Sequence, residues 1–372
     1  MKDRYLLRNL KQLNGESIDI LVDQGRIANI APSGSLGDMA PCLNDFEQNY
    51  VSSGWIDMHV HAFSEFEPYG DEIDEIGVKQ GVTTIVDAGS CGADRIGELL
   101  KLGERAATRL LAFLNISRIG LARIDELTNL EWIDRSAVSQ SALRYREAIV
   151  GLKARISRSV VGPSGLEPLR IARRLSDETE LPLMVHIGSG PPSIEEILPL
   201  LANKDIITHY LNGKKNNLFG EDGQPIRALL EALERGVRLD VGHGTASFSF
   251  KVAEAARSHG IGLHTISSDI YRGNRLNGPV YSLANVLSKF LYLGYSLEEV
   301  IASVTRRAAE WLGRPELGRI RIGDPANLTL FAVDRKPVTL IDSEGDERSA
   351  NFIIEPRGVV ASGKLIKCEI RP

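Results

Sequence analysis

Cysteine is scarce in this sequence. The chain has 372 residues but only three cysteines, Cys42, Cys91 and Cys368, which lie far apart without Cys-x-x-Cys spacing. An odd, scattered set of this kind argues against a disulfide framework and against a zinc site built from thiolates. Because such cysteine usage suits a reducing compartment, we expect a cytoplasmic protein.

Long apolar runs and clusters of basic residues are also missing. No uninterrupted apolar stretch approaches the ~20 residues of a membrane-spanning helix, and the start, MKDRYLLRNLKQLNG, lacks the apolar centre of a signal peptide. The formal net charge is −5, without a Lys/Arg-rich run, which argues against a nucleic-acid-binding surface. We therefore expect a small-molecule substrate, no membrane or nucleic-acid partner, and assembly as a homo-oligomer.

The two ends of the chain share a pattern of short strands. Ser17–Val22 alternates polar and apolar residues, and after a turn-like Asp-Gln-Gly the alternation resumes at Arg26–Ile30. Similar runs recur near the other end, at 327–333, 352–354, 358–360 and 365–366. We therefore predict that residues 1–50 and 318–372 form one small, discontinuous β-sandwich.

Between these ends, strand-like apolar runs are mostly followed by helix-like stretches. Eight such runs occur, at 54–61, 81–88, 110–115, 149–156, 181–187, 205–209, 237–241 and 261–269. Alternating strands and helices predict an α/β protein with a parallel sheet, and eight units predict a closed (β/α)8 TIM barrel over residues 51–317. An open doubly wound sheet is the alternative, but the sequence has neither a GxGxxG motif after the first strand nor a GxxxxGK[ST] motif.

Polar residues stand at the ends of several predicted strands, where barrel enzymes place their chemistry. His59 and His61 are two apart on one strand and therefore point to the same face, which makes half of a metal site. His186 and His209 end the fifth and sixth strands, and Asp269 ends the eighth. A lone histidine at a strand end is more often a hydrogen-bonded structural residue, but this combination favours a metal centre.

Lys153 lies inside the fourth predicted strand, in the apolar context Val-Gly-Leu-Lys-Ala. A buried lysine is costly unless its charge is removed or paired. Reaction with CO₂ would convert it into a carbamate, a negative group able to bridge two cations. An ordinary salt bridge is the alternative that the sequence leaves open.

These motifs resemble the amidohydrolase superfamily over nearly the whole chain. The resemblance rests on the first-strand motif GWIDMHVH, the Lys153 strand, the two strand-end histidines and the SSDIY motif around Asp269. The stretch Gly318–Leu330 is similar to the segment with which chains of this family re-enter their β-domain after the barrel, although Asn327 replaces the usual aspartate. The similarity is closest to a bacterial branch described as deacetylase or dihydroorotase-like, which shares the motifs at 185–188, 208–214, 241–250 and 277–280.

The resemblance implies two divalent metal ions, with zinc as the default for imidazole and carboxylate ligands. His59, His61 and Asp269 would hold the more buried ion, and His186 and His209 the more exposed one. A CO₂-derived carbamate on the fourth-strand lysine would bridge the two ions. Asp269 would also be the catalytic residue, because it can take a proton from the attacking water and pass it to the leaving group.

Other residues are candidates for supporting roles. Asp57 would orient the histidines from behind. Arg155 shares the strand parity of Lys153 and should point inward, whereas His243, after the seventh strand, is placed to meet substrate. Arg272 and Arg275, just after Asp269, are candidate anchors for a substrate carboxylate. We therefore expect Arg155, His243, Arg272 and Arg275 to be substrate-binding residues.

The resemblance therefore implies a hydrolase that cleaves the acyl bond of a small N-acyl amino acid or O-acyl hydroxy acid. A cyclic-amide hydrolase of the dihydroorotase or hydantoinase type is the alternative, but Ala62-Phe63 stands where true dihydroorotases usually have an arginine. Single-metal deaminases usually have an acidic residue after the fifth-strand histidine, where this chain has Ile-Gly-Ser-Gly-Pro-Pro. A non-catalytic scaffold is disfavoured because all six ligand positions are kept.

Overall fold

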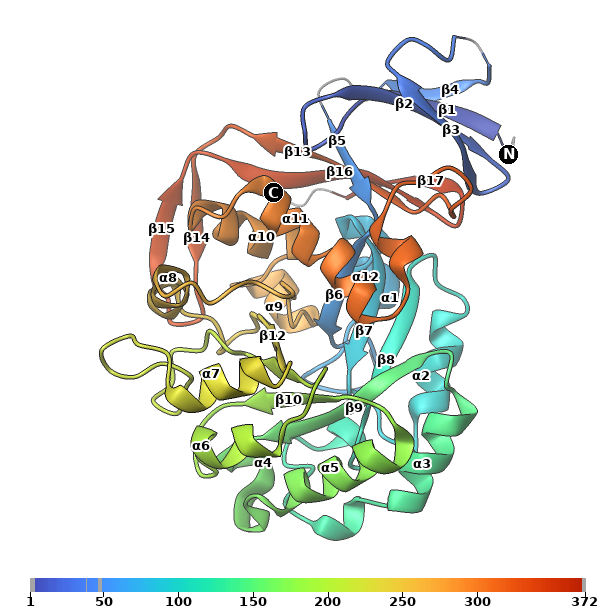
Figure 1. Cartoon of the computed structure of the whole chain (residues 1–372). Coiled ribbons are helices and arrows are strands. Elements are labelled where there is room, and N and C mark those ends of the chain that lie inside the picture. The colour runs from blue at the N-terminus through green and yellow to red at the C-terminus, as the bar shows by residue number, and fades with distance from the viewer. Residues whose placement is uncertain (1–3, 38, 46–48, 370–372) are drawn as a thin grey trace.

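The computed structural model describes residues 4–37, 39–45 and 49–369. Residues 1–3, 38, 46–48 and 370–372, which belong to the predicted β-sandwich, lie outside the described residues. Figure 1 shows a barrel of strands with helices around it, and the strands from both chain ends together on one side of the barrel.

Seven consecutive strands form a parallel sheet in the order β12-β11-β10-β9-β8-β7-β6. Their bounds are β6 (Trp55–Val60), β7 (Val82–Ala88), β8 (Arg109–Asn115), β9 (Ile149–Ile156), β10 (Leu183–Ile187), β11 (Ile206–Thr208) and β12 (Arg238–Asp240). All neighbouring pairs are parallel, so the carboxyl ends of these strands meet at one end of the sheet.

The segment from Thr265 to Ile270 closes this sheet into a barrel. Thr265 bridges Asp240 at the end of β12, and Ile270 bridges Val60 at the end of β6, both in parallel. The predicted eighth strand is therefore present as isolated bridges rather than as a continuous strand. One reason is that the backbone turns at Asp269, whose φ is 51°. The predicted (β/α)8 fold is confirmed, and an open sheet is excluded.

Helices cover the outside of the barrel. The longer helices are α2 (Ile96–Gly103), α3 (Arg135–Arg144), α5 (Glu167–Thr179), α7 (Arg227–Glu234), α8 (Phe250–Ser258), α10 (Leu283–Tyr292) and α11 (Leu297–Ser303). The short ones are α1 (Ile73–Ile76), α4 (Arg158–Val161), α6 (Ile194–Ile197), α9 (Arg272–Asn277) and α12 (Arg306–Trp311), with 3₁₀ turns at 78–80, 120–122, 130–132, 162–164, 198–200 and 315–318. No helix within the described ranges is long and apolar enough to cross a membrane.

The spacing of apolar residues explains how these helices dock. In α5, Leu169, Ala172 and Leu175 are buried at intervals of three residues, while Arg170 and Arg174 face solvent. This gives one apolar stripe along the helix, which packs against β9 and β10. The main apolar core therefore lies between the barrel strands and the surrounding helices.

The two chain ends share one eight-stranded sheet, in the order β17-β16-β13-β5-β1-β2-β3, with β4 paired to β1. Its strands are β1 (Arg4–Lys11), β2 (Ser17–Asp23), β3 (Arg26–Pro32), β4 (Cys42–Asp45), β5 (Tyr50–Ser53), β13 (Leu328–Asp334), β16 (Ile353–Ala361) and β17 (Lys364–Lys367). Residues from both ends, including Leu7, Ile20, Leu328 and Val360, form a separate apolar core. Two further strands, β14 (Val338–Ile341) and β15 (Glu347–Ala350), form a hairpin of their own.

Candidate active site

Two histidines and an aspartate converge where the barrel closes. His59 lies near the end of β6 and His61 follows the strand, and both side chains are buried. Asp269 Oδ1 lies 3.4 Å from His59 Nε2 and 3.2 Å from His61 Nε2. One ligand atom from each residue falls within a group no more than 4.8 Å across, which suits a single divalent cation with two imidazole ligands and one carboxylate ligand.

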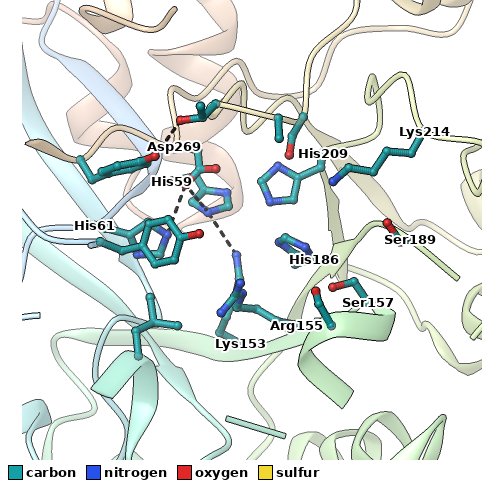
Figure 2. A pocket seen from close by; sticks show the side chains of 17 residues that line it. His59, His61, Lys153, Arg155, Ser157, His186, Ser189, His209, Lys214 and Asp269 are labelled. Atoms are coloured by element: carbon teal, nitrogen blue, oxygen red, sulfur yellow. Dashed lines mark hydrogen bonds and ion pairs between the residues drawn. The ribbon is translucent and has the colours of Figure 1, made fainter. Parts of the chain in front are cut away.

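The other two histidines continue this group toward the middle of the barrel mouth. His186 lies near the end of β10, and His209 directly follows β11. The His209 ring centroid lies 5.1 Å from that of His59 and 4.4 Å from that of His186. Figure 2 shows the rings of His59, His186 and His209 around one cavity, with Asp269 and Lys153 beside them. The structure therefore brings the six predicted ligand residues together.

Three of the four rings use Nδ1 for a contact with the protein. His59 Nδ1 contacts Thr208 Oγ1 at 2.8 Å, His61 Nδ1 contacts Ser90 Oγ at 2.9 Å, and His209 Nδ1 contacts the Gly242 carbonyl at 2.7 Å. Because a carbonyl can only accept, Nδ1 of His209 carries the proton and its Nε2 keeps a lone pair. At His59 the Thr208 hydroxyl donates to Asp240 and must therefore accept from Nδ1, which leaves Nε2 with a lone pair. At His61 the contact with Ser90 occupies Nδ1, so Nε2 is the ring nitrogen that faces Asp269.

Burial favours the neutral form of three of these rings. Burial lowers the pKa of His59, and it lowers the pKa of His186 and His209 further, with neighbouring positive groups adding to the effect. For Asp269, burial acts to raise the pKa. The electrostatic attraction of His59 and His209, together with the hydrogen bond from His61, outweighs burial and holds the pKa of Asp269 well below its usual range. Neutral imidazoles around one carboxylate are the protonation states that metal binding requires.

Lys153 projects from β9 into the same group. Its side chain is buried, and its Nζ lies 3.3 Å from His59 Nε2 and 3.4 Å from Met184 Sδ. Among the described residues Lys153 forms no ion pair, so the structure shows no acidic partner for the salt bridge that the sequence left open. Burial lowers the pKa of Lys153 to about 7. Gly89 makes room for this side chain, since a Cβ at Gly89 would lie 2.6 Å from Lys153 Cβ.

The residues behind the histidines differ from the prediction. Asp57 accepts from the backbone N–H of His59 at 3.2 Å and from Ser268, so it holds the strand rather than an imidazole ring. The ring of His59 is instead oriented by Thr208, whose hydroxyl donates to Asp240 Oδ2 at 2.8 Å. Asp240 also accepts from two further hydroxyl groups at 2.6 and 2.7 Å. No sequence motif signals these contacts, because Thr208 and Asp240 look like ordinary strand residues.

A cavity of about 210 Å³ opens onto these groups. Arg155, Lys214, Ser157 and Ser189 line one side of it, and Figure 2 shows them next to His186. Tyr69 and Tyr271 also line it, with ring centroids 5.1 Å apart and perpendicular planes. Among the described lining residues, Asp269 is the only acid, so the cavity offers more positive than negative groups.

Of the predicted substrate-binding residues, Arg155 lines the cavity. Its Nη1 pairs with the fully buried Glu126, 3.1 Å from Oε2. Lys214, which was not among the predicted residues, also lines the cavity, is half-buried, and forms no ion pair with any described residue. Lys214 stands in a loop after β11, where strand parity gives no information on direction. The available signals were its place five residues after His209 and its position at the end of the motif 208–214.

The other three candidates do not line the cavity. Arg275 is buried and makes a two-pronged ion pair with Asp71, at 2.6 and 2.8 Å. Arg272 is partly exposed and lies near the same aspartate, at 3.9 Å. His243 is fully buried and contacts Lys289. Their neighbours thus account for these side chains without a substrate, and the structure does not support them as substrate anchors.

Comparisons with known proteins cover nearly the full length of the chain, although no family model matches it. A deacetylase of Enterococcus faecalis is 40% identical over 362 residues, which cover 97% of this chain and 98% of that protein. A deacetylase of Agrobacterium fabrum is 35% identical over 374 residues, covering 97% of this chain and 91% of that protein.

Solved structures with the same architecture carry other names. A structure described as an adenine deaminase is 39% identical, with a TM-score of 0.93, and the match covers 98% of this chain and 99% of that one. A structure described as a dihydroorotase is 34% identical, with a TM-score of 0.90 and the same coverage. A D-hydantoinase, at 16% identity and a TM-score of 0.70, shares the fold alone.

A barrel whose strand ends gather four histidines, a lysine and an aspartate defines a hydrolase of the metal-dependent class. The chain belongs to the amidohydrolase superfamily and, within it, to the family of its deacetylase relatives. It is thus a hydrolytic enzyme, and the predicted family resemblance is confirmed.

The hydrogen bond between Thr208 and His59 can be tested by substitution. In Thr208→Val, His59 Nδ1 and Asp240 lose their common partner, so we expect zinc affinity to fall about 10- to 100-fold, as for other residues that orient metal ligands. Competition with a chromophoric chelator measures this affinity. The matched control is Thr84→Val, since Thr84 is equally buried in β7 but its hydroxyl has no partner among the described residues. Equal zinc affinity in both variants would contradict this role for Thr208.

Proposed function

We propose that the protein is a binuclear-metal hydrolase that removes the acyl group from small N-acyl amino acids or O-acyl hydroxy acids. The observation that carries this proposal is the pairing of a histidine-rich metal-binding group with a cationic wall in one small cavity. The names of the deacetylase relatives support the reaction type. The cationic wall supports a substrate with a negative charge.

The donor set fits two divalent cations, for which zinc is the natural choice because the donors are imidazoles and carboxylate oxygens. His59, His61 and Asp269 would hold the buried ion, and His186 and His209 the more exposed one. When bound, the metal pair would activate a water molecule and polarise the acyl carbonyl. Asp269 would take the proton of the attacking water and deliver it to the leaving nitrogen or oxygen.

Charge balance supports a carbamate on Lys153. Two dications bring a charge of +4, and four neutral imidazoles and one carboxylate offset little of it. An ammonium at Lys153 would be repelled by both ions. In the proposed modification, the Nζ lone pair forms a bond to the carbon of CO₂, one C=O electron pair moves onto oxygen, and Nζ releases a proton to solvent. The product adds a charge of −1 and two oxygens, one for each ion.

The charges that line the cavity also bear on the substrate. Arg155 shares its charge with Glu126, but its guanidinium still lines the cavity, and Lys214 has no acidic partner among the described residues. A charged group with no partner is best satisfied by a ligand of opposite charge. A carboxylate beside the scissile acyl bond meets this need, whereas adenine, the substrate in the name of one structural relative, is uncharged.

Substitution of Lys153 tests the bridging role. Lys153→Ala removes the bridge, so we expect loss of about half or more of the bound metal and a fall in kcat of at least about 1,000-fold, since the two metals act as one unit. Short carboxylates such as acetate or propionate should restore part of both by taking the bridging place. Lys153→Glu should keep more metal than Lys153→Ala while remaining slow. Full metal content and near-normal kcat in Lys153→Ala would contradict the proposal.

A substrate panel tests the proposed class. With zinc and bicarbonate supplied, we expect turnover of N-acetyl amino acids or O-acetyl hydroxy acids, and little turnover of their methyl esters, of adenine, or of dihydroorotate and hydantoins. Lys214→Met and Arg155→Met should raise KM for the acids about 10- to 100-fold, as expected for one charged hydrogen bond. Lys215→Met is the matched control, because Lys215 is the next residue and is exposed. Turnover of cyclic amides alone would favour the alternative enzyme class.

A further inference from the structure

The loop after β12 touches two of the proposed metal ligands through its backbone. The Gly242 carbonyl accepts from His209 Nδ1 at 2.7 Å. Gly244 lies against Asp269, since a Cβ at Gly244 would be 2.4 Å from Asp269 Oδ2. Both glycines have positive φ, 49° and 53°, so the loop can approach this closely only with glycine at both positions.

The residues that follow form part of the cavity wall. Thr245, Ala246 and Ser247 line the cavity. The hydroxyl of Thr245 lies 2.7 Å from that of Tyr271, which is two residues after Asp269. The position of this short loop, 242–247, therefore sets both the surroundings of two ligands and one wall of the substrate site.

The side chain between the two glycines does not face the cavity. His243 is fully buried, and its ring stacks on Phe248, with centroids 4.5 Å apart and planes 22° apart. Its Nδ1 lies 2.9 Å from the Gly244 carbonyl, and its Nε2 lies 2.8 Å from Lys289 Nζ. Because the carbonyl can only accept and the amine donates, the proton is on Nδ1 and Nε2 is the acceptor.

Lys289 is an unusual residue for its position. It lies on α10, is fully buried, and donates to the Pro279 carbonyl at 2.8 Å as well as to His243. Among the described residues it makes no ion pair, and burial lowers its pKa to about 7. An apolar side chain would avoid the cost of burying an amine. What the amine provides instead is a link between the loop after β12, which packs against Asp269, and the loop after α9.

We propose that Lys289 and His243 are a pair of positioning residues that hold the 242–247 loop against His209 and Asp269. The inference rests on the proposed function in one respect, because it assumes that these two residues take part in hydrolysis. Neither His243 nor Lys289 touches the cavity, so the pair acts through the loop and not on the substrate.

A double-mutant cycle tests the pair. Lys289→Met removes the donor with little change in volume, and His243→Phe keeps the stacking on Phe248 but removes both nitrogens. We expect each variant to lower kcat per bound metal about 10- to 100-fold, the range for residues that orient catalytic groups, with KM changed less than about threefold. Since each substitution breaks the same link, the double variant should be no slower than the slower single variant.

Two further variants separate positioning from general stability. His243→Gln keeps an acceptor for Lys289 and should recover most of the lost kcat. Ser288→Ala is the matched control on α10, because the Ser288 hydroxyl is buried and accepts from Ile354 N on β16 at 2.9 Å, away from the loop. We expect Ser288→Ala to lower the melting temperature while leaving kcat per bound metal unchanged.

Three outcomes would overturn the inference. The first is an unchanged kcat per bound metal in Lys289→Met, and the second is a double variant whose loss of kcat equals the product of the two single losses. The third is a loss of kcat in Ser288→Ala equal to that in Lys289→Met. The kinetics use whichever compound of the panel the wild-type enzyme hydrolyses. Turnover of cyclic amides alone would thus reject the proposed substrate class but leave this test intact.

Discussion

The closure of the barrel by the segment around Asp269 is the constraint on which the site depends. The Asp269 N–H donates to the His59 carbonyl at 2.7 Å, and the His61 N–H donates to the Ile270 carbonyl at 2.9 Å. These two bonds place the carboxylate beside the two histidines of β6. On the other side, the loop after β12 packs so closely that Gly244 leaves no space for a Cβ beside Asp269.

A second consequence of this closure concerns charge. The barrel mouth holds buried, neutral imidazoles, one carboxylate with a depressed pKa, and a buried lysine whose pKa is lowered to about 7. These polar side chains are costly to bury unless the imidazoles and the carboxylate bind a cation, and unless the amine of Lys153 is modified or paired. The proposed metal pair and carbamate satisfy both needs at once. The cations of Arg155 and Lys214 then remain for the substrate.

The parts of the molecule that could be predicted from the sequence are those that follow from strand periodicity. The barrel, and the convergence of His59 and His61 with the strand-end residues His186, His209 and Asp269, follow from the alternation of strands and helices and from the rule that parallel strands end on one side. The eighth strand was predicted as continuous, but a turn at Asp269 reduces it to two bridges.

The predicted roles of Arg275 and Asp57 differ from the structure because of contacts between segments that are distant in the sequence. Arg275 was expected to face substrate, but its direction depends on Asp71, which is 204 residues away in the sequence. Asp57 was expected to orient the histidine rings, but Thr208 and Asp240 orient that of His59 through contacts between different strands. Loop direction and contacts of this kind leave no periodic signal in a single sequence, which is also why Lys214 was missed.

The central claim is that Lys153 carries a carbamate that joins two metal ions. It is tested most directly by supplying ¹³C-bicarbonate and zinc to metal-free protein, and recording the ¹³C spectrum together with the metal content per chain. The account predicts a carbamate resonance that Lys153→Ala lacks, and two zinc ions per chain. Two tightly bound zinc ions per chain without any carbamate resonance would contradict it.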